Sequence, residues 1–171
     1  MIQATTYQLT ARCACGRVLL KLMGAPIVTV VCYCDDCQEG ARRIESMSDA
    51  SPVKDADGGT AYLAYRKDRL EYAAGREYLL AHKLRPASTT HRVVASCCHS
   101  AMYLGFDDSK HWVDVYRSRL QGAVPPLQMR ICTRFALRPE AVPGDVPRHA
   151  GYPFGLIARL MAARIAMMLR L

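Results

Sequence analysis

The sequence predicts a mainly β fold, an antiparallel sandwich that binds zinc, with one short internal helix and one C-terminal helix. Short runs rich in β-branched and aromatic residues alternate with turn signals, which is typical of such sandwiches or of open barrels. Seven of the eight cysteines fall into clusters, and the last apolar stretch has helical character. With 171 residues, 51% hydrophobic and 22% charged, the chain can bury a core, which excludes intrinsic disorder as its main state.

The first two thirds of the chain hold the predicted strands. Ile27–Cys34 is rich in β-branched residues and predicts a strand. Gln38–Ser48 carries apolar residues at helical spacing and predicts the internal helix. Asp55–Gly59 is a turn. Further short strands are expected at Arg17–Leu22, Thr60–Tyr65, Arg69–Ala73, Glu77–Leu84, Thr90–Ser96, Ala101–Phe106 and Trp112–Arg117.

The charge divides the chain into two parts. Residues 1–116 have a net charge of +1, whereas residues 117–171 hold nine Arg, no Lys and two acids, a net charge of +7. Leu127–Ala136 can add a strand, residues 138–153 with four prolines predict a loop, and Phe154–Leu171 predicts a helix. We therefore expect a zinc-binding β domain over residues 1–117 and a basic, Arg-rich extension over residues 118–171 that ends in an apolar helix.

The extension also bears on partners and location. Its arginines neither form a consecutive run nor alternate with aromatic residues, so a nucleic-acid partner is not expected. A helix this apolar requires burial. We expect docking on the body or a homodimer rather than attachment to a membrane surface, because its polar face is narrow. The final 17 residues carry three arginines, which argues against a membrane span, and no secretory signal opens the chain, so a cytoplasmic location is expected.

The cysteines carry the chemistry, and they are arranged as Cys13-x-Cys15, Cys32-x-Cys34-x-x-Cys37, the adjacent pair Cys97-Cys98, and Cys132. In a reducing compartment such spacings favour metal binding over disulfides. Residues i and i+2 of a strand share a face, so two of these clusters can each present paired sulfurs. A turn at Asp35-Asp36 would then bring Cys37 back to the same point. Cys132 is interpreted as a small buried hydrophobe.

Seven clustered sulfurs exceed the four ligands of one zinc ion, so two sites are expected. Cys13 and Cys15 would join Cys97 and Cys98 in a closed, structural site. Three cysteines (Cys32, Cys34 and Cys37) would leave a fourth position open, which is the mark of a catalytic zinc. Two alternatives stay open: a fourth ligand such as His99, His91 or Asp36 would close this site, and the Cys34-x-x-Cys37 pair could instead be a redox dithiol.

Two motifs, Cys13-Ala14-Cys15-Gly16-Arg17-Val18 and Val31-Cys32-Tyr33-Cys34-Asp35-Asp36-Cys37-Gln38, resemble the glutathione-dependent formaldehyde-activating enzyme and centromere protein V family. The resemblance covers roughly residues 9–117. The third family motif, F-C-x-x-C-G, is replaced by adjacent cysteines within Val94–Ser100, as in a less characterised branch of the family.

The resemblance implies a β-tent fold held by zinc and a carbon–sulfur lyase activity that joins formaldehyde and glutathione into S-hydroxymethylglutathione. It implies a structural zinc on Cys13, Cys15, Cys97 and Cys98 and a catalytic zinc on Cys32, Cys34 and Cys37. Tyr33 stands where the family has His and is expected to pack. Arg42 or Arg43 could offset the charge of three thiolates or meet a substrate carboxylate. The alternative function is a non-catalytic, zinc-stabilised β module that binds a partner through its basic tail.

Overall fold

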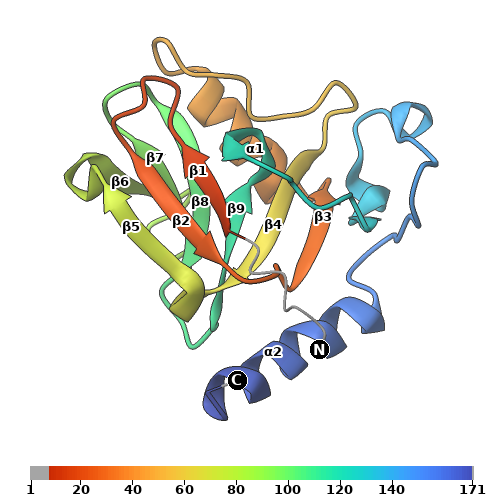
Figure 1. Cartoon of the computed structure of the whole chain (residues 1–171). Coiled ribbons are helices and arrows are strands. Elements are labelled where there is room, and N and C mark those ends of the chain that lie inside the picture. Colours follow the sequence, from red (N-terminus) through yellow and green to blue (C-terminus); the bar gives the residue numbers. More distant parts are fainter. Residues whose placement is uncertain (1–7, 171) are drawn as a thin grey trace.

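The computed structural model describes residues 8–170 and contains two β-sheets and two α-helices (Figure 1). The smaller sheet has the strand order β10-β1-β2-β5, formed by β1 (Gln8–Arg12), β2 (Leu19–Met23), β5 (Leu70–Ala74) and β10 (Leu120–Gln121). The larger sheet has the order β11-β3-β4-β9-β8-β7-β6, formed by β3 (Val28–Cys32), β4 (Thr60–Arg66), β6 (Leu79–His82), β7 (Thr90–Ala95), β8 (Ser100–Phe106), β9 (Trp112–Tyr116) and β11 (Met129–Ile131). The helices are α1 (Asp35–Glu45) and α2 (Phe154–Met168). Short 3-10 turns lie at Lys67–Arg69, Arg76–Tyr78, Arg117–Arg119, Thr133–Phe135 and Pro139–Ala141.

The predicted mainly β class is confirmed, and the described strands pair antiparallel with one exception. Strand β11 runs parallel to β3, with Ile131 opposite Cys32. A parallel pair requires a long connection, and here most of the chain lies between the two strands. The extension adds one strand to each sheet. Strand β10 pairs with β1 in the smaller sheet, and β11 pairs with β3 in the larger sheet.

Two cores cover the two faces of the larger sheet. Between the sheets lie side chains from both, including Leu20, Leu63, Met102 and Val115. The other face is covered by α1 and the extension and includes Val30, Ile44, Tyr62, Tyr116 and Leu156. Every residue of β4 is buried, as expected of a strand in the middle of a sheet that is covered on both faces.

Helix α1 begins at Asp35, three residues before the predicted start at Gln38. The acidic pair that indicated a turn lies in the first helical turn, where carboxylates complement the helix dipole. The buried side of α1 includes Cys37, Ala41 and Ile44. This earlier start places the last cysteine of the second cluster on the helix itself.

Arg130 on β11 fastens the extension to the body. Its guanidinium donates to Asp57 Oδ2 at 2.6 Å, to the Tyr33 hydroxyl at 2.5 Å and to Asp145 Oδ1 at 2.9 Å. The side chains of Arg130 and Asp57 are only 7% and 10% exposed. A charge this deeply buried persists only when it is paired, so this ion pair fixes where β11 lies.

Helix α2 is a helix as predicted, and it touches the body through one side. Leu156 is buried and Leu160 packs against the core, whereas Ile157, Met161 and Ile165 are about half exposed. In Figure 1 this helix lies at the end of β3 and β4. Within residues 8–170, neither helix combines the length and the apolar character needed to cross a bilayer. A homodimer through α2 stays a prediction.

Candidate metal centres

The first cysteine cluster joins the end of β1 to the turn between β7 and β8. The Sγ atoms of Cys13 and Cys15 are 3.6 Å apart, Cys15 and Cys97 are 3.3 Å apart, and Cys97 and Cys98 are 3.9 Å apart. With zinc–sulfur bonds of about 2.3 Å, the edge of a tetrahedral four-sulfur site is about 3.8 Å. The four sulfurs therefore fit the shell of one zinc ion.

The local backbone of this cluster differs from the prediction. Cys13 and Cys15 lie in a turn that follows β1 rather than within a strand, and the turn is closed by Gly16, whose amide donates to the Cys13 carbonyl. The positive φ of Gly16, 81°, is a conformation that glycine adopts at little cost. Cys97 and Cys98 also lie in a turn, and the bend there lets adjacent cysteines face one point.

Hydrogen bonds hold the first cluster in place. The Val18 amide donates to Cys13 Sγ at 3.2 Å, and Ser100 Oγ accepts from the Ala14 amide and lies 3.2 Å from Cys98 Sγ. Burial opposes ionisation of the Cys98 thiol, but the bonds from Ser100 and from nearby amides outweigh it and lower its pKa to about 6. Zinc binds thiolates, so a thiol that ionises readily suits a ligand.

The second cluster lies where β3 meets α1. Cys32 ends β3, Cys34 precedes the first residue of α1, and Cys37 lies in its first turn. Their sulfurs all lie within 4.8 Å of one another. Cys32 and Cys37 are buried, and the Tyr62 hydroxyl lies 3.6 Å from Cys37 Sγ. These three sulfurs fit one face of a zinc tetrahedron, as predicted.

The thiols of the second cluster do not ionise alike. Hydrogen bonds from Cys32 and Cys37 lower the pKa of Cys34 to about 3, assisted by the Cys37 amide and by the charge of Arg92. Interactions with Cys132, Cys34 and Cys37, together with burial, raise the pKa of Cys32 far above its usual range. Cys34 is therefore the ready thiolate, at the N-terminus of a helix where thiolates are favoured.

A cavity of about 290 Å³ opens beside the second cluster, and all three of its cysteines line it. Arg92 also lines the cavity, is 3% exposed and donates to the Asp36 carbonyl. The sequence-based candidates Arg42 and Arg43 instead pair with Glu39 on the exposed side of α1. Arg92, rather than Arg42 or Arg43, thus places a positive charge at the cysteines of the second cluster. The strand pattern around Arg92 gave no sign that its side chain would reach this cluster.

The alternative fourth ligands all have other partners. His99 Nδ1 is 2.6 Å from the Ser48 carbonyl, His91 Nδ1 is 2.9 Å from the Asp107 carboxylate, and Asp36 pairs with Arg85. Among the described residues, none of the three belongs to a cysteine cluster. Tyr33 faces away from the cluster, since its hydroxyl donates to Asp57 and accepts from Arg130, in agreement with the expected packing role.

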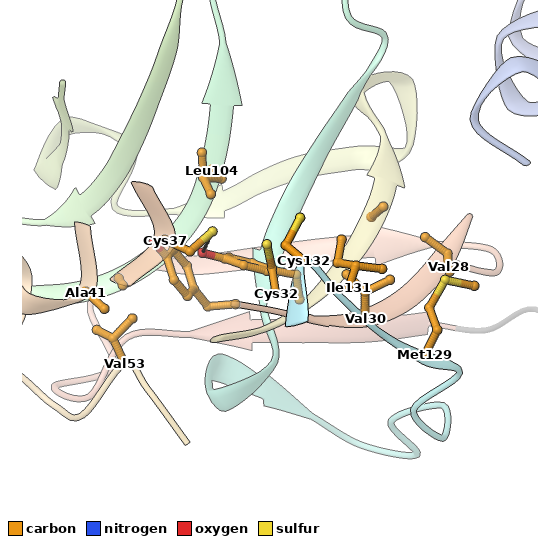
Figure 2. Close-up of a cluster of buried hydrophobic side chains, with 14 of the residues drawn as sticks. Val28, Val30, Cys32, Cys37, Ala41, Val53, Leu104, Met129, Ile131 and Cys132 are labelled. Atoms are coloured by element: carbon orange, nitrogen blue, oxygen red, sulfur yellow. Dashed lines mark hydrogen bonds between the residues drawn. The ribbon is translucent and has the colours of Figure 1, made fainter. Parts of the chain in front are cut away.

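Cys132 is buried, as predicted, but it is more than a small hydrophobe. It follows β11 directly, has a φ of 58°, and its side chain interacts with the thiol of Cys32 (Figure 2). The Cys132 sulfur lies outside the group of three that converge within 4.8 Å. The sequence gives no signal of this neighbour, because only the pairing of β11 with β3 brings the two cysteines together.

A family profile described as glutathione-dependent formaldehyde-activating enzyme matches residues 8–124. The chain belongs to this family. Among curated proteins no relative matches. A solved structure of a Rhodobacter sphaeroides protein is similar to the chain at 17% sequence identity with a TM-score of 0.49, and the match covers 81% of this chain and 98% of that one. Membership of the family indicates a glutathione-related, aldehyde-activating type of function, and it leaves the extension beyond residue 124 outside the matched region.

Proposed function

We propose that the chain is a zinc-dependent carbon–sulfur lyase-like protein that acts on a thiol, glutathione or a similar one, and an aldehyde adduct. The observation that carries the proposal is the convergence of Cys32, Cys34 and Cys37 on the wall of a cavity. A centre with three protein ligands beside a cavity leaves room for a substrate atom at the fourth position. A thiol and an aldehyde are the substrates to which the family membership points.

The reaction needs no oxidant or reductant. The sulfur of the thiol forms a bond to the carbonyl carbon, the carbon–oxygen double bond becomes a single bond, and the thiol proton ends on that oxygen. Bound zinc would supply a lowered pKa for the substrate thiol or polarisation of the aldehyde oxygen.

The residues of the chain prepare the site for this reaction. Hydrogen bonds from Cys32 and Cys37 lower the pKa of Cys34, which favours the thiolate form that a zinc ion binds. Three thiolates give the centre a net negative charge, and the buried guanidinium of Arg92 offsets part of it. Cys32, Cys37 and Arg92 are buried, and electrostatic interactions are stronger away from water.

The cluster of Cys13, Cys15, Cys97 and Cys98 would have the structural role. Four sulfurs complete a tetrahedral shell, so this site has no position left for a substrate. Binding of zinc there would tie the end of β1 to the β7–β8 turn and would contribute directly to the folding free energy.

The test of the proposal is Cys34→Ser compared with Cys98→Ser. Wild-type protein is expected to hold two zinc ions per chain and to accelerate exchange between formaldehyde, glutathione and S-hydroxymethylglutathione, measured by NMR line shape. Cys34→Ser should lose this acceleration and keep its circular dichroism spectrum, whereas Cys98→Ser should lower the thermal midpoint, because it removes a ligand of the structural site. Undiminished exchange in folded Cys34→Ser would overturn the proposal.

The second candidate, a non-catalytic zinc-stabilised module with a basic tail for its partner, is favoured by one observation. Cys132 interacts with Cys32, and its sulfur, which lies outside the group of three, would close the second centre if it moved into that group. X-ray absorption on the zinc-loaded protein separates the two candidates. An average of fewer than four sulfurs per zinc, with a ligand that exchanges for added thiol, supports the enzyme, and four sulfurs at both centres support the module.

A further inference from the structure

The cavity at the second centre is larger than a one-carbon aldehyde requires. It measures about 290 Å³. An apolar protein cavity of roughly 150 Å³ is enough to bind benzene, whereas formaldehyde has only two non-hydrogen atoms. The volume therefore leaves space for more of the substrate than its reacting carbon and oxygen.

The cavity extends from the cysteines along β3. Cys32, Val30 and Val28 alternate along β3, so their side chains share one face, and all three line the cavity (Figure 2). From Cys32 to Val28 is four residues of strand, about 13 Å at 3.3 Å per residue. A substrate whose reacting atom sits at the cysteines would thus lay its substituent along β3.

The walls along this path are apolar and come from two parts of the chain. The larger sheet contributes Ala64, Leu104 and Trp112. The extension contributes Ile131, Tyr152, Leu156 and Leu160, all beyond the residues that match the family. The first two turns of α2 therefore form part of the wall of the site.

The polar groups of the cavity do not favour an anionic substituent. Asp114 lies on the path, opposite Ala64 and Leu104 in the sheet register. Lys110 lies at the rim, where its ammonium pairs with Asp108 and stands over the ring of Phe106. Arg92 lies at the cysteines and Lys110 is paired with Asp108, so these two cations of the cavity wall do not serve an anionic substituent laid along β3.

We propose that this site selects an adduct whose aldehyde part carries an apolar aliphatic or aromatic substituent, and that the extension provides this selectivity. The proposal rests on the proposed function for the reacting end of the substrate. The apolar part of the cavity beside α2, the apolar chamber, can be tested by ligand binding alone, without turnover.

Binding is tested with benzyl alcohol, which has the shape of an aromatic aldehyde but reacts with neither thiols nor amines. Calorimetric titration of the zinc-loaded full-length protein should show saturable binding of benzyl alcohol and none of methanol. Trp112, the single tryptophan of the chain, lines the cavity and should change its emission in the same titration. Leu160→Trp, which fills the chamber, should weaken binding about tenfold. Ile157→Trp, on the exposed side of the same helix, should bind like wild type.

Activity is tested with glutathione and either benzaldehyde or formaldehyde. The wild-type ratio of kcat/KM for benzaldehyde over formaldehyde should be about ten or more, and Leu160→Trp should lower this ratio. If Leu160→Trp does not fold, the wild-type ratio alone still tests the proposal, because a ratio of about ten or more supports it and a ratio below one contradicts it. Turnover of formaldehyde without binding of benzyl alcohol would overturn this inference and leave the proposed function standing. Binding of benzyl alcohol without turnover of either aldehyde would support the apolar chamber and contradict the proposed function.

Discussion

Arg130→Met is expected to destabilise the protein by about 3–5 kcal/mol, because it leaves the carboxylate of Asp57 buried without its partner. The side chain of Asp57 is 10% exposed, so water cannot replace the lost guanidinium. Asp145, the second carboxylate on Arg130, is 52% exposed, and its pairing contributes about 0–1 kcal/mol. Almost all of the expected loss therefore comes from the Asp57 contact and from the bond to the Tyr33 hydroxyl.

The assay is equilibrium unfolding in urea at pH 7 with saturating zinc, since zinc occupancy itself shifts stability. With a urea slope of about 2 kcal/mol per molar, the midpoint should fall by roughly 1.5–2.5 M. Asp145→Asn is the matched control and should change the free energy of unfolding by less than about 1 kcal/mol. Asp57→Asn combined with Arg130→Met should recover part of the loss. If Arg130→Met and Asp145→Asn unfold at the same urea concentration, the reasoning about burial is wrong.

The remaining predictions concern a glycine, a carboxyl and the metal. Gly75→Ala should cost more than about 1 kcal/mol, because φ is +71° and the new Cβ would lie 2.3 Å from the Arg17 carbonyl oxygen, whereas Gly144→Ala should leave the thermal midpoint in place. Burial raises the pKa of Asp114 to about 7, so the folded chain keeps a proton that the unfolded chain releases between about pH 4 and pH 7. The free energy of unfolding should fall across that window by at most about 4 kcal/mol in wild type but not in Asp114→Asn, and equal pH profiles would refute this. Removal of zinc by a chelator should lower the thermal midpoint and make all seven clustered thiols reactive, and an unchanged midpoint would contradict a structural zinc.

Much of the fold could be predicted because strands and turns leave local signals. The β-branched run at Ile27–Cys34 became β3, and the apolar stretch after Pro153 became α2. The start of α1 was predicted too late, since Asp35 and Asp36 favour both a turn and a first helical turn. The strand expected over Leu127–Ala136 is only Met129–Ile131, because Cys132 turns the backbone into the left-handed region.

The candidate sites followed from counting sulfurs, which requires no knowledge of the fold. The structure brings together the same two groups, although Cys13 and Cys15 converge through a turn rather than through strand alternation. The neighbourhood of Cys32 could not be predicted in the same way. Arg92 and Cys132 are distant in sequence and reach this point because β7 pairs with β8 and β11 pairs with β3 within the larger sheet. No local pattern encodes such a register.

The parallel pairing of β11 has a consequence for shortened forms of the protein. On one side β3 is bonded to β4, and on the other the Tyr33 amide donates to Ile131 and the Gln128 amide donates to Thr29. A fragment that stops at residue 124, where the family match ends, would leave this side of β3 as a bare sheet edge. Uncovered edge strands that are rich in β-branched residues pair between molecules. A shortened protein would therefore aggregate through β3, the segment that carries Cys32. The last third of the chain thus protects the solubility of the domain that it covers.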